Sequence, residues 1–356
     1  MSLLFAENPN VASPFLFIPL TLLSFYLFAS VASWKFTRQI FQKDFSASER
    51  GKAPWDLLIA FAFLIVFAII SPSVCARITP FVQDKIPVLN ITTNESQNER
   101  DLATNVESPT VDETNKKRDL STQHPVARML IRSVGTRSFP IVLAVFVFTV
   151  VVVAPITEEL IFRVVIQSAC EKAFFDKRPL EQDNDVRSSK SFLRIAAVVL
   201  PSAILFALMH FSRPEDPAAP IPVDELFSTT IATAASNVLT TILVLTFLVK
   251  ICGAKKGDLG FNRSSDGNSI AAIDFLKDFF RGTFLFVYFA PCVYALHIAA
   301  QTILTNVVVD PLPIFLFALF SGVVYYRTHS YPAVVGIHVG LNFTSFLCLC
   351  MSLGAQ

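Results

Sequence analysis

Long apolar runs alternate with shorter polar segments along most of the chain, and this pattern predicts a bundle of membrane-spanning helices. A helix needs about 20 apolar residues to cross the hydrocarbon core of a bilayer. Runs near this length lie at 15–33, 56–74, 139–154, 194–212, 228–250, 283–304, 312–326 and 332–353. Trp34 and Lys35 follow the first run as an interfacial anchor pair. Because no small-residue cleavage site is evident there, we expect a span rather than a signal peptide.

Residues 156–175 combine a helical pattern with polar side chains. Pro155 is expected to stop the preceding helix, and Thr157 can serve as the N-cap of a new one. Polar residues are costly against lipid, so a span at 157–175 has to lie inside the bundle. We therefore predict an all-α, polytopic transmembrane helix bundle of about eight or nine spans.

The composition of the chain also indicates a membrane protein. Hydrophobic residues make up 53% of the chain and charged residues only 16%, whereas soluble domains are about a quarter charged. The net charge of +1 gives no reason to expect a nucleic-acid partner. The six cysteines form no CxxC pair, so neither a disulfide framework nor a zinc-finger spacing is indicated.

The apolar runs fall into two groups separated by a polar segment. We expect N-terminal membrane spans in 1–76, a polar and partly disordered loop in 77–138, and a helical core in 139–353. The loop contains glycosylation-type triplets at Asn90 and Asn94, which matter only in a eukaryotic, lumenal setting.

Three groups of polar residues stand inside apolar helices, where ionisable side chains are expensive and usually functional. The first contains Glu158, Glu159 and Arg163. Glu159 and Arg163 lie four positions apart and can pair on one helix face, which leaves Glu158 without that partner as a candidate general base. The alternative is a helix start at which acidic residues favour the helix dipole.

The second group is Phe206 with His210, near the end of a long apolar helix. A histidine there can instead be a hydrogen-bonded core residue. The third group is His338 with Asn342, which share a helix face and suit polar contacts to a substrate carbonyl. Gly336 and Gly340 form a small-residue pair that lets another helix approach closely. Here the alternative role is packing between helices.

Two histidines and a glutamate can hold a catalytic zinc ion, and Glu158, His210 and His338 are the candidate ligands. However, these residues lie on three separate helices, and the helical H-E-x-x-H spacing is absent. We expect a site that works without a metal or other cofactor, with zinc as the alternative.

The order of these groups resembles the CPBP family, the CAAX proteases and bacteriocin-processing enzymes also called the Abi family. The family's EExxxR, FxxxH and HxxxN motifs match, in this order, Glu158, Glu159 and Arg163, then Phe206 and His210, then His338 and Asn342. The run Gly322–Ser330 also looks like the family's glycine, tyrosine, arginine, threonine and serine run. The resemblance covers roughly residues 139–350.

The resemblance implies an all-helical intramembrane endopeptidase of the prenyl-protein CAAX type. It implies that Glu158 and His210 activate water, that His338 and Asn342 hold the oxyanion, and that Glu159, Arg163 and Phe206 support them. Compact members of the family have little more than one helix between the second and third motifs. This chain has two additional candidate spans there, an insert at about 228–304.

The membrane topology provides a check on the site. The first two motifs reach the same membrane face only if 157–175 spans, so convergence favours nine spans. The basic loop 35–54 then lies opposite the basic loops 175–193 and 251–282, and the positive-inside rule does not decide which face is cytoplasmic.

The predicted partners are the lipid bilayer and a membrane-tethered peptide or protein substrate. The chain is expected to be an integral, multi-pass protein of a bacterial inner membrane or a eukaryotic endomembrane. Two other functions stay open. Intramembrane Glu and His also form the proton relays of coupled transporters, although no inverted repeat is evident. A non-catalytic immunity or binding protein could retain the same scaffold.

Overall fold

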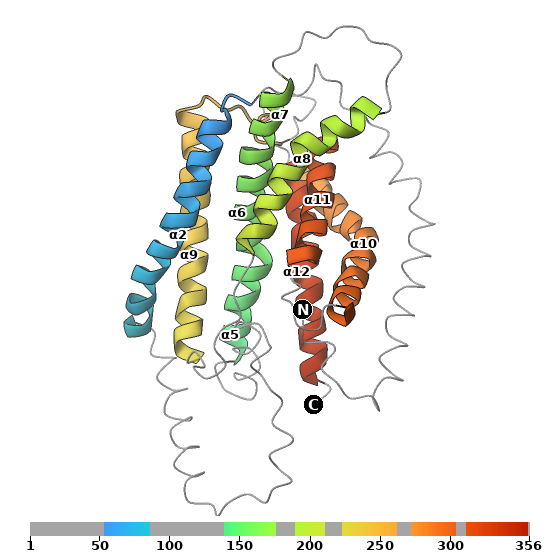
Figure 1. The fold of residues 1–356 in the computed structure, drawn as a ribbon. Helices are drawn as coiled ribbons and strands as arrows, with labels where there is room; N and C mark the ends of the chain where they lie inside the picture. Colours follow the sequence, from blue (N-terminus) through green and yellow to red (C-terminus); the bar gives the residue numbers. More distant parts are fainter. Residues whose placement is uncertain are drawn as a thin grey trace, which may run out of the picture.

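A computed structural model describes residues 53–85, 139–175, 189–210, 223–261, 272–303 and 311–354. Within these ranges the elements are all helices (Figure 1). The expected span at 15–33, the two glycosylation triplets and most of the expected loop 77–138 lie outside the described residues. The elements, in chain order, are α2 (Leu57–Lys85), α5 (Phe139–Phe146), η5 (Val147–Val153), α6 (Ala154–Glu159), η6 (Leu160–Gln167), α7 (Ser168–Phe175), α8 (Ser189–Met209), α9 (Val223–Lys250), α10 (Ala272–Ile303), α11 (Pro311–Thr328) and α12 (Tyr331–Gly354).

Four of the described helices are long and apolar enough to cross a membrane. They cover Leu57–Val82, Phe139–Phe174, Phe227–Lys250 and Tyr331–Cys348, and shorter apolar helices cover Ile195–Met209 and Leu312–Thr328. The prediction of an all-α membrane helix bundle is confirmed, while the total number of spans stays a prediction.

The segment from Phe139 to Phe175 is one continuous helix, so the expectation of a separate span at 157–175 is wrong. Pro155 falls in the first turn of α6, directly after the π-helical segment η5, and the chain continues without a break. A proline removes one backbone donor, and a π-helical turn already shifts the hydrogen-bond pattern there, so the helix accommodates the proline. Thr157 is fully buried and is not an N-cap.

This continuity changes how the first two motifs meet. Glu158 lies near the middle of the long helix rather than near its end. Helix α8 then runs obliquely back and ends beside α6, part of the way along the bundle (Figure 1). His210, directly after α8, therefore reaches Glu158 without an additional span.

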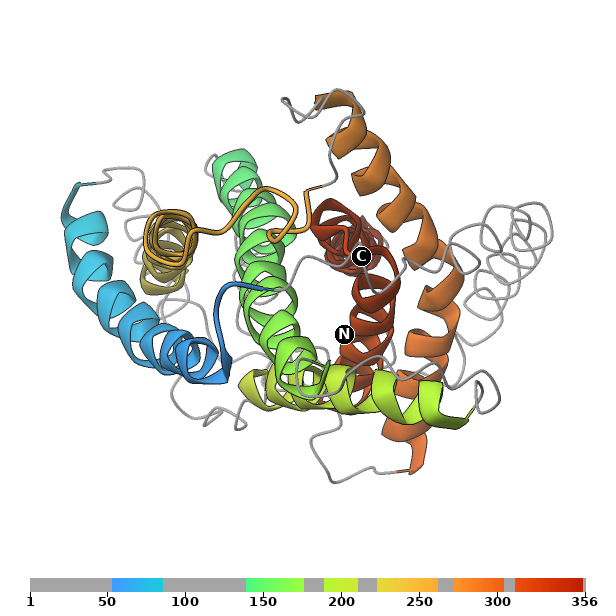
Figure 2. The same ribbon diagram turned by 90° about the horizontal axis from the view of Figure 1, so that it is seen from above.

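The long helix is the centre of the fold. Figure 2 shows α2 and α9 on one side of it and α10 to α12 on the other, with α8 crossing along one edge. Every residue of η6 is buried, as expected for a segment surrounded by helices. Helix α2 continues to Lys85, beyond the boundary expected at residue 76, and Trp55 just before it donates a hydrogen bond to the Val165 carbonyl over 3.0 Å.

Most of the described basic residues lie at one end of the bundle, where α2 begins and α7 and α9 end, whereas Arg77 and Lys85 lie toward the other end of α2. The former include Lys172, Lys250, Lys255, Lys256, Lys277, Arg281 and Arg327. Because Phe139–Phe175 is a single helix, α8 and α10 also start at this end (Figure 1). The basic loops that were expected on opposite faces therefore connect to the same end.

We predict that this basic end faces the cytoplasm, following the positive-inside rule. In a cysteine-free background, Lys256→Cys lies in an exposed turn just after α9 and is expected to react with an impermeant maleimide when the cytoplasmic side of sealed vesicles faces outward. Phe81→Cys, near the other end of α2, is the control and is expected to react only when the opposite side of the vesicle membrane faces outward. Labelling of Lys256→Cys only from the non-cytoplasmic side would contradict the orientation.

Candidate active site

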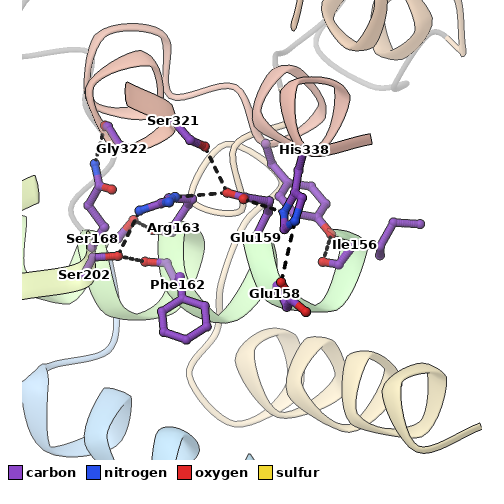
Figure 3. Close-up of polar contacts among 12 residues, drawn as sticks. Ile156, Glu158, Glu159, Phe162, Arg163, Ser168, Ser202, Ser321, Gly322 and His338 are labelled. Carbon is purple, nitrogen blue, oxygen red and sulfur yellow. Dashed lines mark hydrogen bonds and ion pairs between the residues drawn. The ribbon is translucent and has the colours of Figure 1, made fainter. Parts of the chain in front are cut away.

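A buried ion pair lies in the middle of the long helix. Glu159 and Arg163 have fully buried side chains, and the Arg163 Nε donates to Glu159 Oε2 over 3.0 Å. Ser321 of α11 donates to the same carboxylate oxygen at 3.2 Å, and the Arg163 Nη1 donates to Ser202 of α8 at 3.2 Å (Figure 3). Buried charges need hydrogen-bond partners, and α8 and α11 each supply one here, while the Arg163 Nη2 makes no hydrogen bond among the described residues.

His338 of α12 completes the contacts of this carboxylate. Its Nδ1 lies 2.9 Å from Glu159 Oε1, so the two oxygens of Glu159 contact different partners. Arg163 keeps Glu159 ionised, and an ionised carboxylate only accepts hydrogen bonds. His338 Nδ1 therefore carries the proton, and its Nε2 is directed to Glu158 Oε2 at 3.7 Å.

His210 approaches Glu158 from α8. Its Nδ1 lies 2.8 Å from the Phe206 carbonyl, which can only accept, so Nδ1 is again the protonated nitrogen. Its Nε2 lies 3.4 Å from Glu158 Oε2. The Phe206 ring stacks on His210 with 4.5 Å between centroids and also contacts the His338 ring edge-on at 5.7 Å. Phe206 thus fixes the orientation of both imidazoles.

Glu158 is the point where the two imidazoles meet. Its side chain is 19% exposed, and its Oε2 is buried and makes no hydrogen bond to the protein. Two Nε2 atoms face this one oxygen. Since both Nδ1 protons are already used, the Nε2 atoms and the carboxylate are the groups that can exchange a proton with a reacting molecule.

Asn342 lies one turn after His338 on the same face of α12. Its Nδ2 donates to the Val150 carbonyl in η5 over 2.8 Å. The structure thus brings Glu158, His210 and His338 into one cluster, whereas the described contact of Asn342 is with the backbone of the long helix. This bond fixes the depth of α12 beside η5.

Several residues of the site were not found from the sequence. Ser202 and Ser321 each make a hydrogen bond to the ion pair, and the Tyr331 hydroxyl donates to the Ile156 carbonyl over 2.7 Å. Next to Glu158, the Thr157 hydroxyl lies 3.1 Å from the Asn237 carbonyl and 2.9 Å from the Thr241 hydroxyl, both in α9. Their only sequence signal is a polar residue in an apolar run, which is too common to single them out.

Among the described residues, no group of three or more His, Cys, Asp and Glu is arranged to hold a metal ion. Zinc on Glu158, His210 and His338 stays the alternative, and a metal-free site stays a prediction.

The fold and this cluster define a helical membrane protein with ionisable groups enclosed between its helices. Residues 140–253 match a family model described as type II CAAX prenyl endopeptidase Rce1-like. This match confirms the resemblance to the CPBP family and supports a CAAX-type intramembrane endopeptidase. It contains the residues of the first two motifs, and His338 and Asn342 lie outside it. No curated protein and no solved structure matches the chain.

The ion pair generates a prediction about stability. Arg163→Met leaves the Glu159 charge without its main partner and is expected to cost about 3–5 kcal/mol of unfolding free energy. The double variant Glu159→Gln with Arg163→Met removes both charges and is expected to lose less. Thermal unfolding in detergent compares the two. A double variant that is less stable than Arg163→Met alone would contradict this account of the pair.

Proposed function

We propose that the protein is an intramembrane endopeptidase that cleaves membrane-tethered peptides or proteins by attack of water, in the manner of CAAX processing. The observation that supports this best is the Glu158 carboxylate lying between the Nε2 atoms of His210 and His338. The cluster lies between helices that are apolar enough to cross a membrane, which is where a membrane-tethered substrate is held.

In the proposed mechanism Glu158, assisted by His210, takes a proton from water. The water oxygen bonds to the carbonyl carbon of the peptide, and the carbonyl electron pair moves onto the oxygen. When this intermediate collapses, the carbon–nitrogen bond breaks and the amine leaves with the proton held by Glu158 and His210. Phe206 keeps the His210 ring in place for both transfers.

His338 and Asn342 are proposed to stabilise the oxyanion. Because the Nδ1 proton of His338 is bound to Glu159, its Nε2 can donate a hydrogen bond only when the ring is a cation. The Glu159 carboxylate faces the Nδ1 of His338, and Arg163 and Ser321 hold this carboxylate in place. Glu159 is thus a positioning residue for His338.

A proton-coupled transporter and a non-catalytic binding protein remain the competing functions. The family match favours the peptidase over both. A transporter needs its ionisable groups to reach both membrane faces in turn, whereas the cluster here is fixed by contacts from α8, α11 and α12. Prenylated CAAX tails and other membrane-bound peptides are the two substrate classes to be compared in a cleavage assay.

We predict that Glu158→Gln keeps the fold and abolishes proteolysis, because an amide cannot accept the proton from water. Cleavage of a membrane-tethered reporter by the purified variant measures this. Substantial cleavage would end the assignment of Glu158 as the base.

Glu159→Gln is the matched control, since it changes the adjacent carboxylate. Losing the charge that faces Arg163 should lower the melting temperature, whereas Glu158→Gln should leave it unchanged. The same preparations test the metal expectation. Stoichiometric zinc, with activity lost to a chelator and restored by zinc, would show that the site is a zinc site instead.

We also predict that Asn342→Ala lowers kcat by about 100- to 1,000-fold with little change in KM, the usual result of removing one oxyanion donor. His338→Ala should behave alike, and the double variant should fall short of additivity because the two act as one unit. Steady-state cleavage at matched expression measures both constants. A rise in KM alone would make Asn342 a substrate-docking residue.

A further inference from the structure

Helix α10 belongs to the insert that separates the second and third motifs, and it packs along the back of α12. The two helices run in the same direction, with contacts from Asp278–Ser330 at the start of α12 to Phe286–Gly340 further along. Ser330 Oγ donates to Asp278 Oδ2 over 3.0 Å, and also accepts from the Ala333 backbone at 3.4 Å as the cap of α12. The start of α12 is therefore tied to α10.

The two backbones approach each other through glycines. A Cβ atom on Gly282 of α10 would lie 1.8 Å from the Ala333 carbonyl oxygen, and one on Gly336 of α12 would lie 2.1 Å from the Phe279 carbonyl oxygen. Thr283 adds a hydrogen bond to the Gly336 carbonyl over 3.1 Å. These neighbours are backbone atoms, which cannot turn aside as a side chain can. No other residue type fits at 282 or 336 unless a helix moves.

The glycine face and the chemical face of α12 point in opposite directions. Gly336 precedes His338 by two residues, and Gly340 precedes Asn342 by two, which is about 200° of rotation on a helix. Gly336 and Gly340 contact α10, while His338 and Asn342 contact Glu159 and Val150 of the long helix. A displacement at the glycine face is thus passed directly to the two side chains.

In lipid, helices are not driven together by the hydrophobic effect, and close packing fixes their positions. We infer that α10 is a positioning helix, and that Gly282 and Gly336 set the place of His338 and Asn342 relative to Glu158. The expected effect on kcat rests on the proposed function. The expected effect on the position of α12 rests on the packing alone.

Gly282→Ala is the test, because this residue is on α10 and touches none of the proposed catalytic groups. The added methyl group forces the helices apart by about 1 Å, and a misplacement of that size can cost about 100-fold in rate. We expect kcat to fall by about that factor, with KM within about two-fold. Gly257→Ala is the matched control, since a Cβ there meets nothing within 4 Å and its φ is ordinary.

A second readout does not depend on activity. Phe146 and Phe346 lie against each other with 5.7 Å between ring centroids, one turn beyond Asn342 on α12. In a cysteine-free background, cysteines at these two positions report the spacing of α12 from the long helix by oxidative cross-linking. Gly282→Ala should lower the cross-linking yield, and Gly257→Ala should leave it unchanged.

Gly340→Ala offers a milder change if Gly282→Ala fails to fold. Its Cβ would meet the Phe286 ring at 2.8 Å, and a ring can be removed. Gly340→Ala should lower kcat less than Gly282→Ala, and adding Phe286→Ala should restore part of the kcat and of the cross-linking yield.

A loss of folded protein with unchanged kcat per folded molecule and an unchanged cross-linking yield would overturn the positioning role. If even the unaltered protein cleaves no reporter, the proposed function fails, and the cross-linking series still decides whether α10 positions α12.

Discussion

The buried Glu159–Arg163 pair is the interaction on which the rest of the structure depends. Two opposite charges with no exposure to solvent need hydrogen-bond partners for their other polar atoms. Ser202 of α8 contacts the Arg163 Nη1, and Ser321 of α11 and His338 of α12 contact the two Glu159 oxygens, while the Arg163 Nη2 is buried without a hydrogen bond among the described residues. Three helices that are distant in the sequence must therefore contact one point of the long helix, and this requirement fixes the arrangement of the core around η6.

The same pair determines how the neighbouring carboxylate can act. By binding the Nδ1 proton of His338, Glu159 directs the Nε2 of that ring to Glu158. The Phe206 carbonyl does the same for His210. Of two adjacent glutamates on one helix, one is saturated by fixed partners and the other retains a buried oxygen without a hydrogen bond. Different surroundings thus give identical side chains a structural and a chemical task.

The sequence predicts the all-helical class. It also predicts that the motifs containing Glu158, His210 and His338 form one site, because polar residues in apolar runs are rare. It fails at Pro155 and Thr157, which have the form of a helix boundary. The π-helical segments that carry the helix through this point have no recognisable sequence signature. This error also made the predicted topology wrong, because the additional span expected at 157–175 reversed the membrane side assigned to every later loop. Single serines such as Ser202 and Ser321 could not be found, because their value comes only from contacts between helices.

The glycines of α12 show how the insert and the site depend on each other. Gly336 and Gly340 were expected to admit a neighbouring helix, and α10 is the helix that they admit. Helix α9 contacts the other half of the site through Thr157, the residue before Glu158. Each helix of the insert therefore packs against a segment that carries proposed catalytic groups. Helix α9 packs beside Glu158, the proposed base, and α10 packs behind His338 and Asn342, the proposed oxyanion donors. A change at the contacts of α9 or α10 is therefore expected to move the groups that these helices support, which couples the packing of the insert to the geometry of the site.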